Sequence, residues 1–213
     1  MGNSASTREV AGDLLVKLGH EYSDLVVVGG DLNKSTFANK FQAQFPDRFF
    51  DFGPAEQNMV SVAAGLAASG KIPVVSTFAV FGTARPFDQL RVGVSQSKLN
   101  VKLILTHSGL LTAEDGVSAQ SIEDIAIMSA LPSFTVIVPA DGPETEKAIR
   151  ASIEMNGPVY IRLSRPATPI VHTTDYDFKI GIAEVMREGE DVTIVSYGIM
   201  VDESLKAAQD LEK

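Results

Sequence analysis

The feature that most constrains the fold is a regular alternation of helix-like segments with short apolar runs. The segment TREVAGDLLVKLGHEY has the periodicity of an amphipathic helix, and the apolar run DLVVVGG follows it directly. The same alternation repeats along most of the chain, with Val and Ile concentrated in the apolar runs. Short β-branched runs between helices are typical of parallel strands that are buried on both faces. The sequence therefore predicts an α/β fold, a parallel sheet with helices on both faces.

The periodicity assigns approximate bounds to these elements. The predicted strands are 24–29, 48–52, 72–78, 101–106, 134–138 and 158–163. The predicted helices are 7–20, 36–45, 55–69, 84–97, 121–131 and 143–156. Ser6 and Glu9 have the spacing of a capping box at the start of the first helix. Ligands of parallel sheets bind at the carboxyl ends of the strands, so we expect the functional site at that edge.

The helix and strand pattern ends after the last predicted strand. The next residues, SRPATPIVHTTDYDF, lack periodicity and contain two prolines, which indicates an inter-domain linker at 165–179. Residues 180–213 predict a strand pair and a helix, which are too few elements to bury a core of their own. We therefore expect a first domain at 1–164 and part of a second domain at 180–213.

Composition excludes several classes of partner. The net charge of −9 would repel a phosphate backbone, so nucleic acid is not an expected partner. No apolar run approaches the roughly 20 residues needed to span a bilayer, so no membrane partner is expected either. The chain has no cysteine and no secretory signal pattern, which fits a reducing, cytoplasmic location.

One carboxylate, Glu56, lies in the first turn of a helix made mainly of small apolar residues. Phe78 and Phe81 follow the next predicted strand. Two aromatic rings near a carboxylate could sandwich a flat heteroaromatic ring whose nitrogen bonds to the carboxylate. The alternative stays open, because a helix N-terminus favours a carboxylate for its own sake and aromatic residues often only pack the core.

Further polar residues follow other strands. His107 comes directly after a strand, and Asp115 lies in the loop beyond it. Arg8, Ser35 and Arg165 form a set suited to gripping a phosphate group, since two guanidinium groups and a hydroxyl supply many donors. Taken singly, each could be an ordinary surface residue, and a lone histidine is often structural. A glycine-rich phosphate loop is not found, so the sequence offers parts of a site rather than a complete catalytic set.

In their order along the chain, these segments resemble the pyrimidine-binding domain of transketolase from about residue 5 to about residue 165. The tail from about residue 180 resembles the start of the transketolase C-terminal domain. The matching motifs are TREVAGDLL, GGDLNKS, FGPAEQNMVSVAAGLA, STFAVF, RPFDQLR, THSGL, AEDG and LSRP.

The resemblance implies a thiamine diphosphate site. Glu56 matches the catalytic glutamate that faces the aminopyrimidine nitrogen of the cofactor, and Phe78 and Phe81 match positions that hold the pyrimidine ring. Asp31 matches an aspartate at the interface next to the cofactor. At Ala84 many transketolases have a tyrosine that completes the pocket, so one wall is expected to be thinner here.

The resemblance also implies a sugar phosphate site. His107 matches a catalytic histidine near the substrate hydroxyl groups, and Asp115 matches an aspartate that binds a hydroxyl farther along. Ala119 stands where the family usually has a second substrate histidine, which puts the usual donor sugar in doubt. The residues that match the phosphate-binding positions are Arg8, Ser35 and Arg165.

The family's diphosphate-binding motif, Gly-Asp-Gly followed later by Asn, is absent from the sequence. The resemblance therefore implies the C-terminal subunit of a split transketolase, with no metal site of its own. An N-terminal subunit with the diphosphate-binding domain is the expected partner and would contribute the Mg²⁺ site. We also expect a homodimer, because an apolar cofactor-facing surface would otherwise be exposed.

The activity that the resemblance implies is transfer of a two-carbon ketol unit between phosphorylated sugars, as in pentose phosphate metabolism. A deoxyxylulose-phosphate synthase-like enzyme and a 2-oxo-acid dehydrogenase beta-subunit-like enzyme are alternatives, since both use the same domain and the same glutamate. A non-catalytic assembly subunit is the alternative from another class, and Ala84 and Ala119 favour it.

Overall fold

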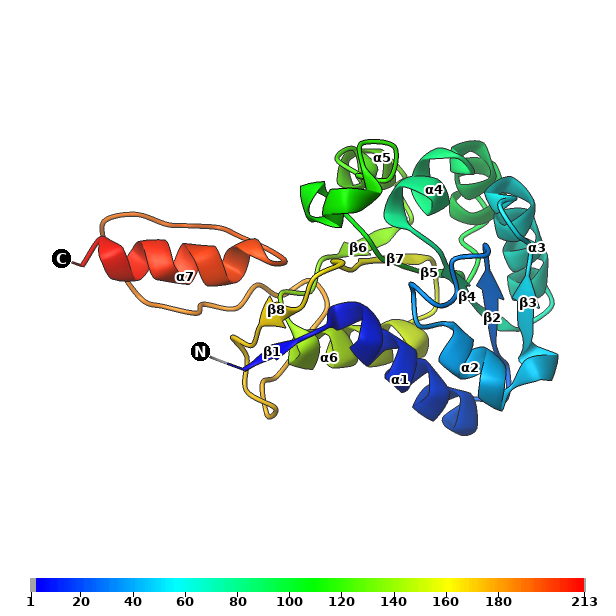
Figure 1. The fold of residues 1–213 in the computed structure, drawn as a ribbon, viewed down its shortest axis with the longest axis horizontal. Helices are drawn as coiled ribbons and strands as arrows, with labels where there is room; N and C mark the ends of the chain where they lie inside the picture. Colours follow the sequence, from blue (N-terminus) through cyan, green and yellow to red (C-terminus); the bar gives the residue numbers. More distant parts are fainter. Residues whose placement is uncertain (1–2, 213) are drawn as a thin grey trace.

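A computed structural model, which describes residues 3–212, contains a six-stranded parallel sheet (Figure 1). The strand order is β3-β2-β4-β5-β7-β6, and all five neighbouring pairs are parallel. All six strands predicted in the first domain are present, and each is slightly shorter than its predicted range. Their bounds are β2 (Leu25–Gly29), β3 (Phe49–Asp51), β4 (Ile72–Ser76), β5 (Lys102–Leu105), β6 (Thr135–Ile137) and β7 (Val159–Arg162).

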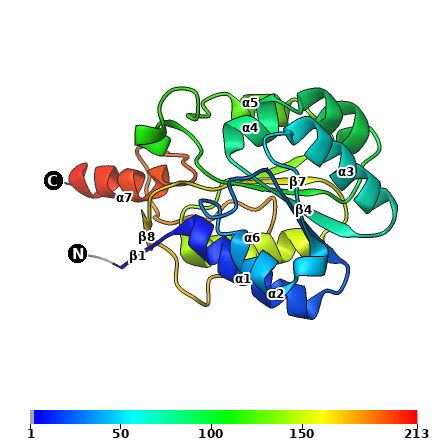
Figure 2. The same ribbon diagram turned by 45° about the vertical axis from the view of Figure 1, so that its right-hand side comes forward.

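Helices cover both faces of this sheet, as the predicted fold class requires (Figures 1 and 2). The helices on one face are α1 (Thr7–Glu21), α2 (Asn39–Gln44) and α6 (Gly142–Glu154), and those on the other face are α3 (Glu56–Ala68), α4 (Ala79–Ala84) and α5 (Asp124–Ser129). Two short 3-10 segments, η1 (Pro46–Arg48) and η3 (Leu110–Asp115), lie in the connections. Within residues 3–212, no helix is long and apolar enough to cross a membrane.

Alternate side chains of each strand enter different cores. Val27 and Val74 pack with the α1, α2 and α6 layer, while their neighbours Val28 and Val75 pack with the α3 and α5 layer. All four are completely buried. Because successive strand residues point to opposite faces, a central strand with two apolar faces must be apolar throughout. For this reason the sequences of the strands are continuous runs of apolar residues.

The predicted capping of the first helix is present. The Ser6 side chain accepts a hydrogen bond from the backbone N–H of Glu9, at 3.4 Å. Such a bond satisfies one of the backbone donors that the first turn of a helix leaves free.

The predicted helix at 84–97 was wrong at its start. Helix α4 begins at Ala79, directly after Phe78 forms a β-bridge with Thr106, and a π-helical segment, η2 (Gln89–Ser95), follows it. Gly82 makes the early start feasible, since a Cβ there would lie 2.8 Å from the Leu105 side chain. Glycine has low helix propensity, so the sequence pattern hides a helix that tertiary packing enforces.

The predicted linker is partly ordered. Strand β8 (Thr168–Pro169) lies within it and pairs antiparallel with β1 (Ser4–Ala5) near the other end of the first domain. Backbone pairing with β1 therefore holds the start of the linker against the domain.

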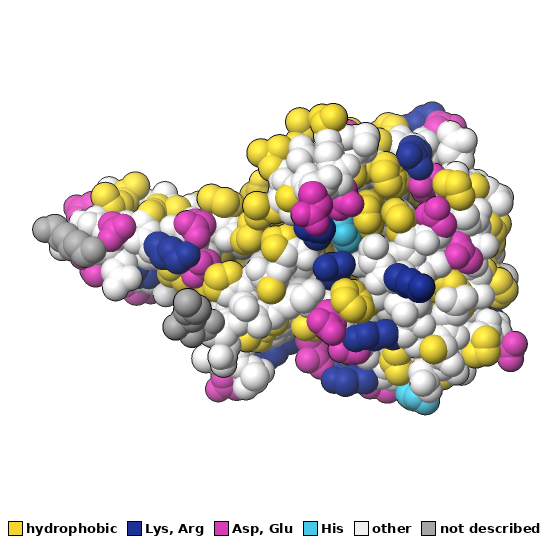
Figure 3. Space-filling view, viewed as in Figure 1, with side chains coloured by type: hydrophobic (Ala, Val, Ile, Leu, Met, Phe, Trp, Pro, Cys, Tyr) yellow, Lys and Arg dark blue, Asp and Glu magenta, His cyan; other side chains and the backbone are white. Residues whose placement is uncertain are grey.

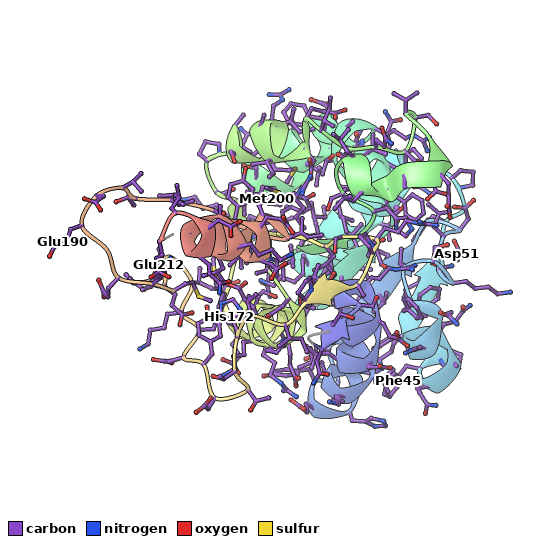
Figure 4. The ribbon with its side chains drawn as sticks, turned by 60° about the vertical axis from the view of Figure 1, so that its left-hand side comes forward. Phe45, Asp51, His172, Glu190, Met200 and Glu212 are labelled. Atoms are coloured by element: carbon purple, nitrogen blue, oxygen red, sulfur yellow. The ribbon has the colours of Figure 1, made fainter. Side chains whose placement is uncertain are left out.

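The strand pair predicted in the tail was also wrong. Between Gly181 and Ile199 the structure has no strand, and the tail's one regular element among the described residues is α7 (Met200–Asp210). Figure 4 shows the tail loop reaching away from the sheet, with Glu190 far from the domain and Met200 where α7 begins. Ile182 is 70% exposed and Val195 is 87% exposed. A lone hairpin without a packed face is only marginally stable in water, which accounts for the absence of strand pairing between Gly181 and Ile199.

Candidate active site

The candidate residues converge at the carboxyl edge of the sheet. Asp31 follows β2, Phe78 follows β4, His107 follows β5 and Arg165 follows β7. These strands are neighbours in the order β2-β4-β5-β7, so the residues that follow them lie along one continuous edge. The structure thereby brings together segments that are far apart in the sequence.

Glu56 is the first residue of α3 and is only 4% exposed. Its Oε1 accepts a hydrogen bond from Nη1 of Arg85 at 2.7 Å, which also makes the two an ion pair. Both side chains line a hollow of ≈ 490 Å³, together with residues 54–58. A buried carboxylate is costly unless it is paired or hydrogen-bonded, so Glu56 requires a donor from this hollow, and Arg85 supplies it here.

Three rings form a stack beside this carboxylate. Phe78 lies parallel to Phe81, with centroids 5.9 Å apart and an interplanar angle of 12°. Phe78 also stacks on His107, with centroids 3.7 Å apart. Aromatic pairs in contact have centroids about 4.5–7 Å apart, so Phe78 and Phe81 already touch. The sandwich of a flat ligand ring between these two residues stays a prediction.

His107 is held rigidly in the interior. It is 2% exposed, has a left-handed backbone with φ of 56°, and its Nδ1 is 2.8 Å from Oγ1 of Thr106. Burial and, to a smaller extent, the nearby positive charges of Arg8 and Arg165 together lower the pKa of His107 to about 4. The imidazole is therefore neutral near pH 7 and can act there as a neutral hydrogen-bonding group.

Replacing Arg165 by Met should raise the pKa of His107, because one of two repelling cations is removed. The pKa should stay below the ordinary 6.5, since burial is the larger cause of the shift. Titration of the imidazole by NMR measures this directly. The control is Arg150→Met, which removes an arginine paired with Glu21 on the outer side of α6 and should leave the His107 titration unchanged. An unaltered pKa in Arg165→Met would contradict the coupling.

Arg8 and Arg165 lie next to each other and together form a basic cluster. Arg8 donates from Nε to the carbonyl of Arg165 at 3.0 Å and from Nη1 to the carbonyl of Ser35 at 2.7 Å. Nε of Arg165 lies 3.4 Å from the Asp115 carboxylate, and Arg165 also pairs with Glu114. Burial and the Arg165 charge lower the pKa of Arg8. On the face drawn in Figure 3, Lys and Arg side chains gather near the middle beside Asp and Glu side chains.

Asp31 lies at the edge of this arrangement. It has a left-handed backbone, with φ of 62°, and lines a second hollow of ≈ 270 Å³ together with Ser35. Its N–H donates to Oδ1 of Asp51, which also accepts from Gly53. Although burial raises the pKa of Asp51, the hydrogen bonds from Gly53, Asp31 and Asn33 keep it below its usual value. Asp51 thus fixes the turn that carries Asp31.

Sequence reasoning missed two groups of residues. Arg85 was not singled out, although its i, i+4 spacing from Phe81 predicts that both lie on one helical face. Asp124 was not singled out either, yet it is completely buried and accepts from Nε of Arg162 at 2.7 Å and from the Tyr160 hydroxyl at 2.5 Å. The hydrogen bond between Asp124 and Tyr160 joins a helix to a strand, so no simple sequence pattern predicts it.

Ala84 and Ala119, the two residues that depart from the family motifs, differ in their exposure. Ala119 is 5% exposed and Ala84 is exposed. Among residues 3–212, no group of three His, Asp or Glu side chains is arranged to hold a metal ion.

The fold is that of a transketolase pyrimidine-binding domain, whose sequence profile matches residues 3–171. A second profile, the transketolase C-terminal domain, matches residues 181–213. The chain belongs to the transketolase family.

Individual relatives show how much of such a protein the chain covers. A protein of Methanocaldococcus jannaschii named as a transketolase C-terminal section is 43% identical over 208 residues, which are 97% of this chain and 66% of that protein. Human transketolase is 39% identical over 216 residues, and the chain spans 34% of its length.

Two solved structures have a similar fold. One is described as a split-gene transketolase in an inactive beta4 tetramer; it has 47% sequence identity and a TM-score of 0.88, and the match covers 100% of this chain and 68% of that one. The other is the transketolase of Campylobacter jejuni, with 25% identity and a TM-score of 0.90 over 99% of this chain and 34% of that one.

Proposed function

We propose that this chain is the pyrimidine-side subunit of a split, thiamine-diphosphate-dependent transketolase. It would transfer a two-carbon ketol unit between phosphorylated sugars. The observation that carries the proposal is the buried Glu56 carboxylate beside the Phe78, Phe81 and His107 stack, next to the Arg8 and Arg165 cluster. The relatives named as transketolases support the same activity.

The residues present fit the aminopyrimidine half of this cofactor. Glu56 offers a buried carboxylate to a ring nitrogen, and Arg85, which lines the same hollow, lies over the face of the Phe81 ring. When bound, thiamine diphosphate supplies a carbon nucleophile that can attack a ketose carbonyl. Glu56 would hold a proton at the ring nitrogen, which is general acid–base work by a positioned side chain. The stacked rings would fix the orientation of the ligand ring and exclude water from it.

The basic cluster fits the phosphate end of a sugar. The guanidinium groups of Arg8 and Arg165 could bind phosphate oxygens in a bidentate manner, and charge-assisted bonds of that kind are strong. Asp115 already pairs with Arg165, so it is placed to bind a hydroxyl group next to the phosphate. His107 is neutral, so it can donate or accept a hydrogen bond to a sugar hydroxyl without adding charge.

The remaining parts of the enzyme would come from a partner. An N-terminal subunit with the diphosphate-binding domain would hold the Mg²⁺ and the diphosphate, so the cofactor would lie at the interface of two chains. A homodimer of this chain, its cytoplasmic location and the domain limits at 1–164, 165–179 and 180–213 stay predictions. The name of the archaeal relative as a C-terminal section supports the division into two subunits.

Reconstitution tests the proposal. The purified chain is mixed with its cognate N-terminal subunit, and glycolaldehyde transfer from a ketose phosphate to an aldose phosphate is followed. We expect turnover with the mixture and none with either subunit alone. Absence of turnover with every common donor and acceptor pair would contradict the proposal. Decarboxylation of pyruvate by the mixture would favour the deoxyxylulose-phosphate synthase-like or 2-oxo-acid dehydrogenase-like alternatives.

A non-catalytic assembly subunit is the second candidate function. The solved relative described as an inactive tetramer favours it, as do Ala84 and Ala119 at positions where the family has ligand-binding side chains. Calorimetric titration of the assembled complex with thiamine diphosphate and Mg²⁺ separates the two candidates. Binding with a stoichiometry of one cofactor per chain supports catalysis, and absence of binding supports assembly.

A further inference from the structure

The guanidinium group of Arg85 occupies an unusual position in the candidate site. Its Cζ lies 4.0 Å from the centroid of the Phe81 ring, and its Nη1 donates to Oε1 of Glu56 at 2.7 Å. It therefore extends the stack of Phe81, Phe78 and His107 by one further planar group. The same side chain contacts both the aromatic surface and the carboxylate.

A guanidinium group and an aminopyrimidine ring present similar chemistry to these two residues. Both are flat, both carry N–H donors in the plane, and both stack on aromatic faces. Glu56 can bind either one through a carboxylate oxygen, whereas the Phe81 face can cover only one planar group at a time. The two ligands therefore exclude each other at this place.

We propose that Arg85 is an internal placeholder for the aminopyrimidine ring, which must swing out before thiamine diphosphate can bind. This inference rests on the function proposed above. The side chain of Arg85 is 48% exposed and borders the open hollow, so it has solvent to move into. Nε2 of Gln57 donates to the Arg85 carbonyl at 3.2 Å, which anchors the backbone while the side chain moves.

A placeholder has two consequences for the free chain. It neutralises the buried Glu56 carboxylate, which would otherwise be an unpaired charge in the interior. It also weakens cofactor binding, because the apparent dissociation constant rises as the population of the open state falls. To bind, the cofactor must displace the half-exposed Arg85 from its ion pair with Glu56 and from its cation–π contact with Phe81. Together these two contacts should lower the affinity for the cofactor roughly tenfold.

The test compares thiamine diphosphate affinity of the assembled two-subunit complex with and without this side chain. In Arg85→Met we expect a dissociation constant lowered about tenfold. The matched control is Arg91→Met, which removes an exposed arginine paired with Asp88 and should leave the affinity unchanged. Unchanged or weaker binding in Arg85→Met would overturn the placeholder and leave the proposed function intact. Absence of binding by the wild type and both variants would overturn the proposed function together with the placeholder.

A second measurement does not depend on a substitution. The side-chain N–H signals of arginine are followed by NMR in the wild-type chain while 4-amino-2-methylpyrimidine, which lacks the diphosphate, is added. We expect the Arg85 Nη1–H, which donates to Glu56 in the free chain, to lose its protection from solvent exchange as the ring binds. A ring that binds while Arg85 stays protected would contradict displacement, and Arg85 would then be a permanent wall of the pocket.

Discussion

Glu56→Gln should abolish ketol transfer by the assembled enzyme while leaving the chain folded. Glutamine has the same shape as glutamate but cannot take up or release a proton near neutral pH. General acid–base catalysis by one side chain typically contributes about 10²–10⁴-fold, so we expect kcat to fall by at least about 100-fold. The fold should tolerate the change, because the helix N-terminus loses a favourable charge interaction of about 0.3–1 kcal/mol and the glutamine oxygen can still accept the hydrogen bond from Arg85.

The measurement is a coupled assay of ketol transfer, with circular dichroism to verify folding. Glu203→Gln is the matched control, because Glu203 is an exposed carboxylate in the first turn of another helix, α7. It should keep wild-type activity. If Glu56→Gln retained more than about a tenth of the wild-type kcat, Glu56 would be a helix-capping residue and the proposed mechanism would fail.

The sheet could be predicted from the sequence because its central strands are apolar on both faces. Val27, Val28, Val74 and Val75 are all apolar because both faces of β2 and β4 are covered by helices. Such continuous β-branched runs occur in few other settings. The order of the strands in the sheet was not specified by this pattern, because pairing joins segments that are distant in the sequence.

The errors in the fold share a physical cause. The start of α4 was missed because Gly82 has low helix propensity, while close packing on β5 imposes the helix. The strand pair was predicted within residues 180–213, but apolar residues of this segment such as Ile182 and Val195 are exposed in the structure. In both places the outcome depends on contacts with other segments, and a local pattern contains no information about those contacts.

The candidate site also contains some residues that the sequence pattern predicts and others that it does not. Residues directly after strands, such as His107 and Arg165, could be placed at one edge from the sequence, because the edge follows from a parallel sheet. The pairing of Arg85 with Glu56 could not, since it joins the residue after α4 to the first residue of α3 across 29 positions of sequence. The roles assigned to these residues by the resemblance stay predictions until the variants are measured.

Asp141→Ala should destabilise the chain by about 3 kcal/mol or more, because it breaks a buried charge pair. Asp141 is completely buried at the N-cap of α6, where Oδ1 accepts from the N–H of Glu144 at 2.9 Å. Its Oδ2 accepts from the N–H groups of Val171 and His172, both at 2.8 Å, and lies 3.2 Å from Nδ1 of His172. Removal leaves three backbone donors without this acceptor, and each buried unsatisfied donor costs about 1–3 kcal/mol.

Denaturant unfolding of the purified chain measures this loss, with the midpoint expected to fall at constant m-value. Asp141→Asn, which keeps an acceptor for the helix cap, should lie between Asp141→Ala and the wild type. Asp13→Ala is the surface control, because Asp13 pairs with Lys40 on the exposed side of α1 and such pairs contribute at most about 1 kcal/mol. Equal losses in the buried and surface variants would contradict the role assigned to Asp141.

The contribution of Asp141 should also depend on pH in a defined window. Burial raises the pKa of Asp141, but the hydrogen bonds from His172 and the three backbone N–H groups outweigh it and hold the pKa below 3.8. This stabilisation is present above pH 3.8 and is lost as the pH falls through the lowered value.

His172 sets the upper limit of that window. Burial lowers its pKa, but Asp141, Glu144 and Glu184 outweigh burial and raise the pKa above 6.5. Its charged form therefore stabilises the fold fully below pH 6.5, and the effect fades as the pH rises through the raised value. Glu144 has a raised pKa because of burial, so its own titration adds stability only toward acid pH. The difference in unfolding free energy between wild type and Asp141→Ala should thus be largest between about pH 4 and pH 6.5 and smaller at pH 9, and a difference that grew steadily up to pH 9 would rule out the His172 pairing.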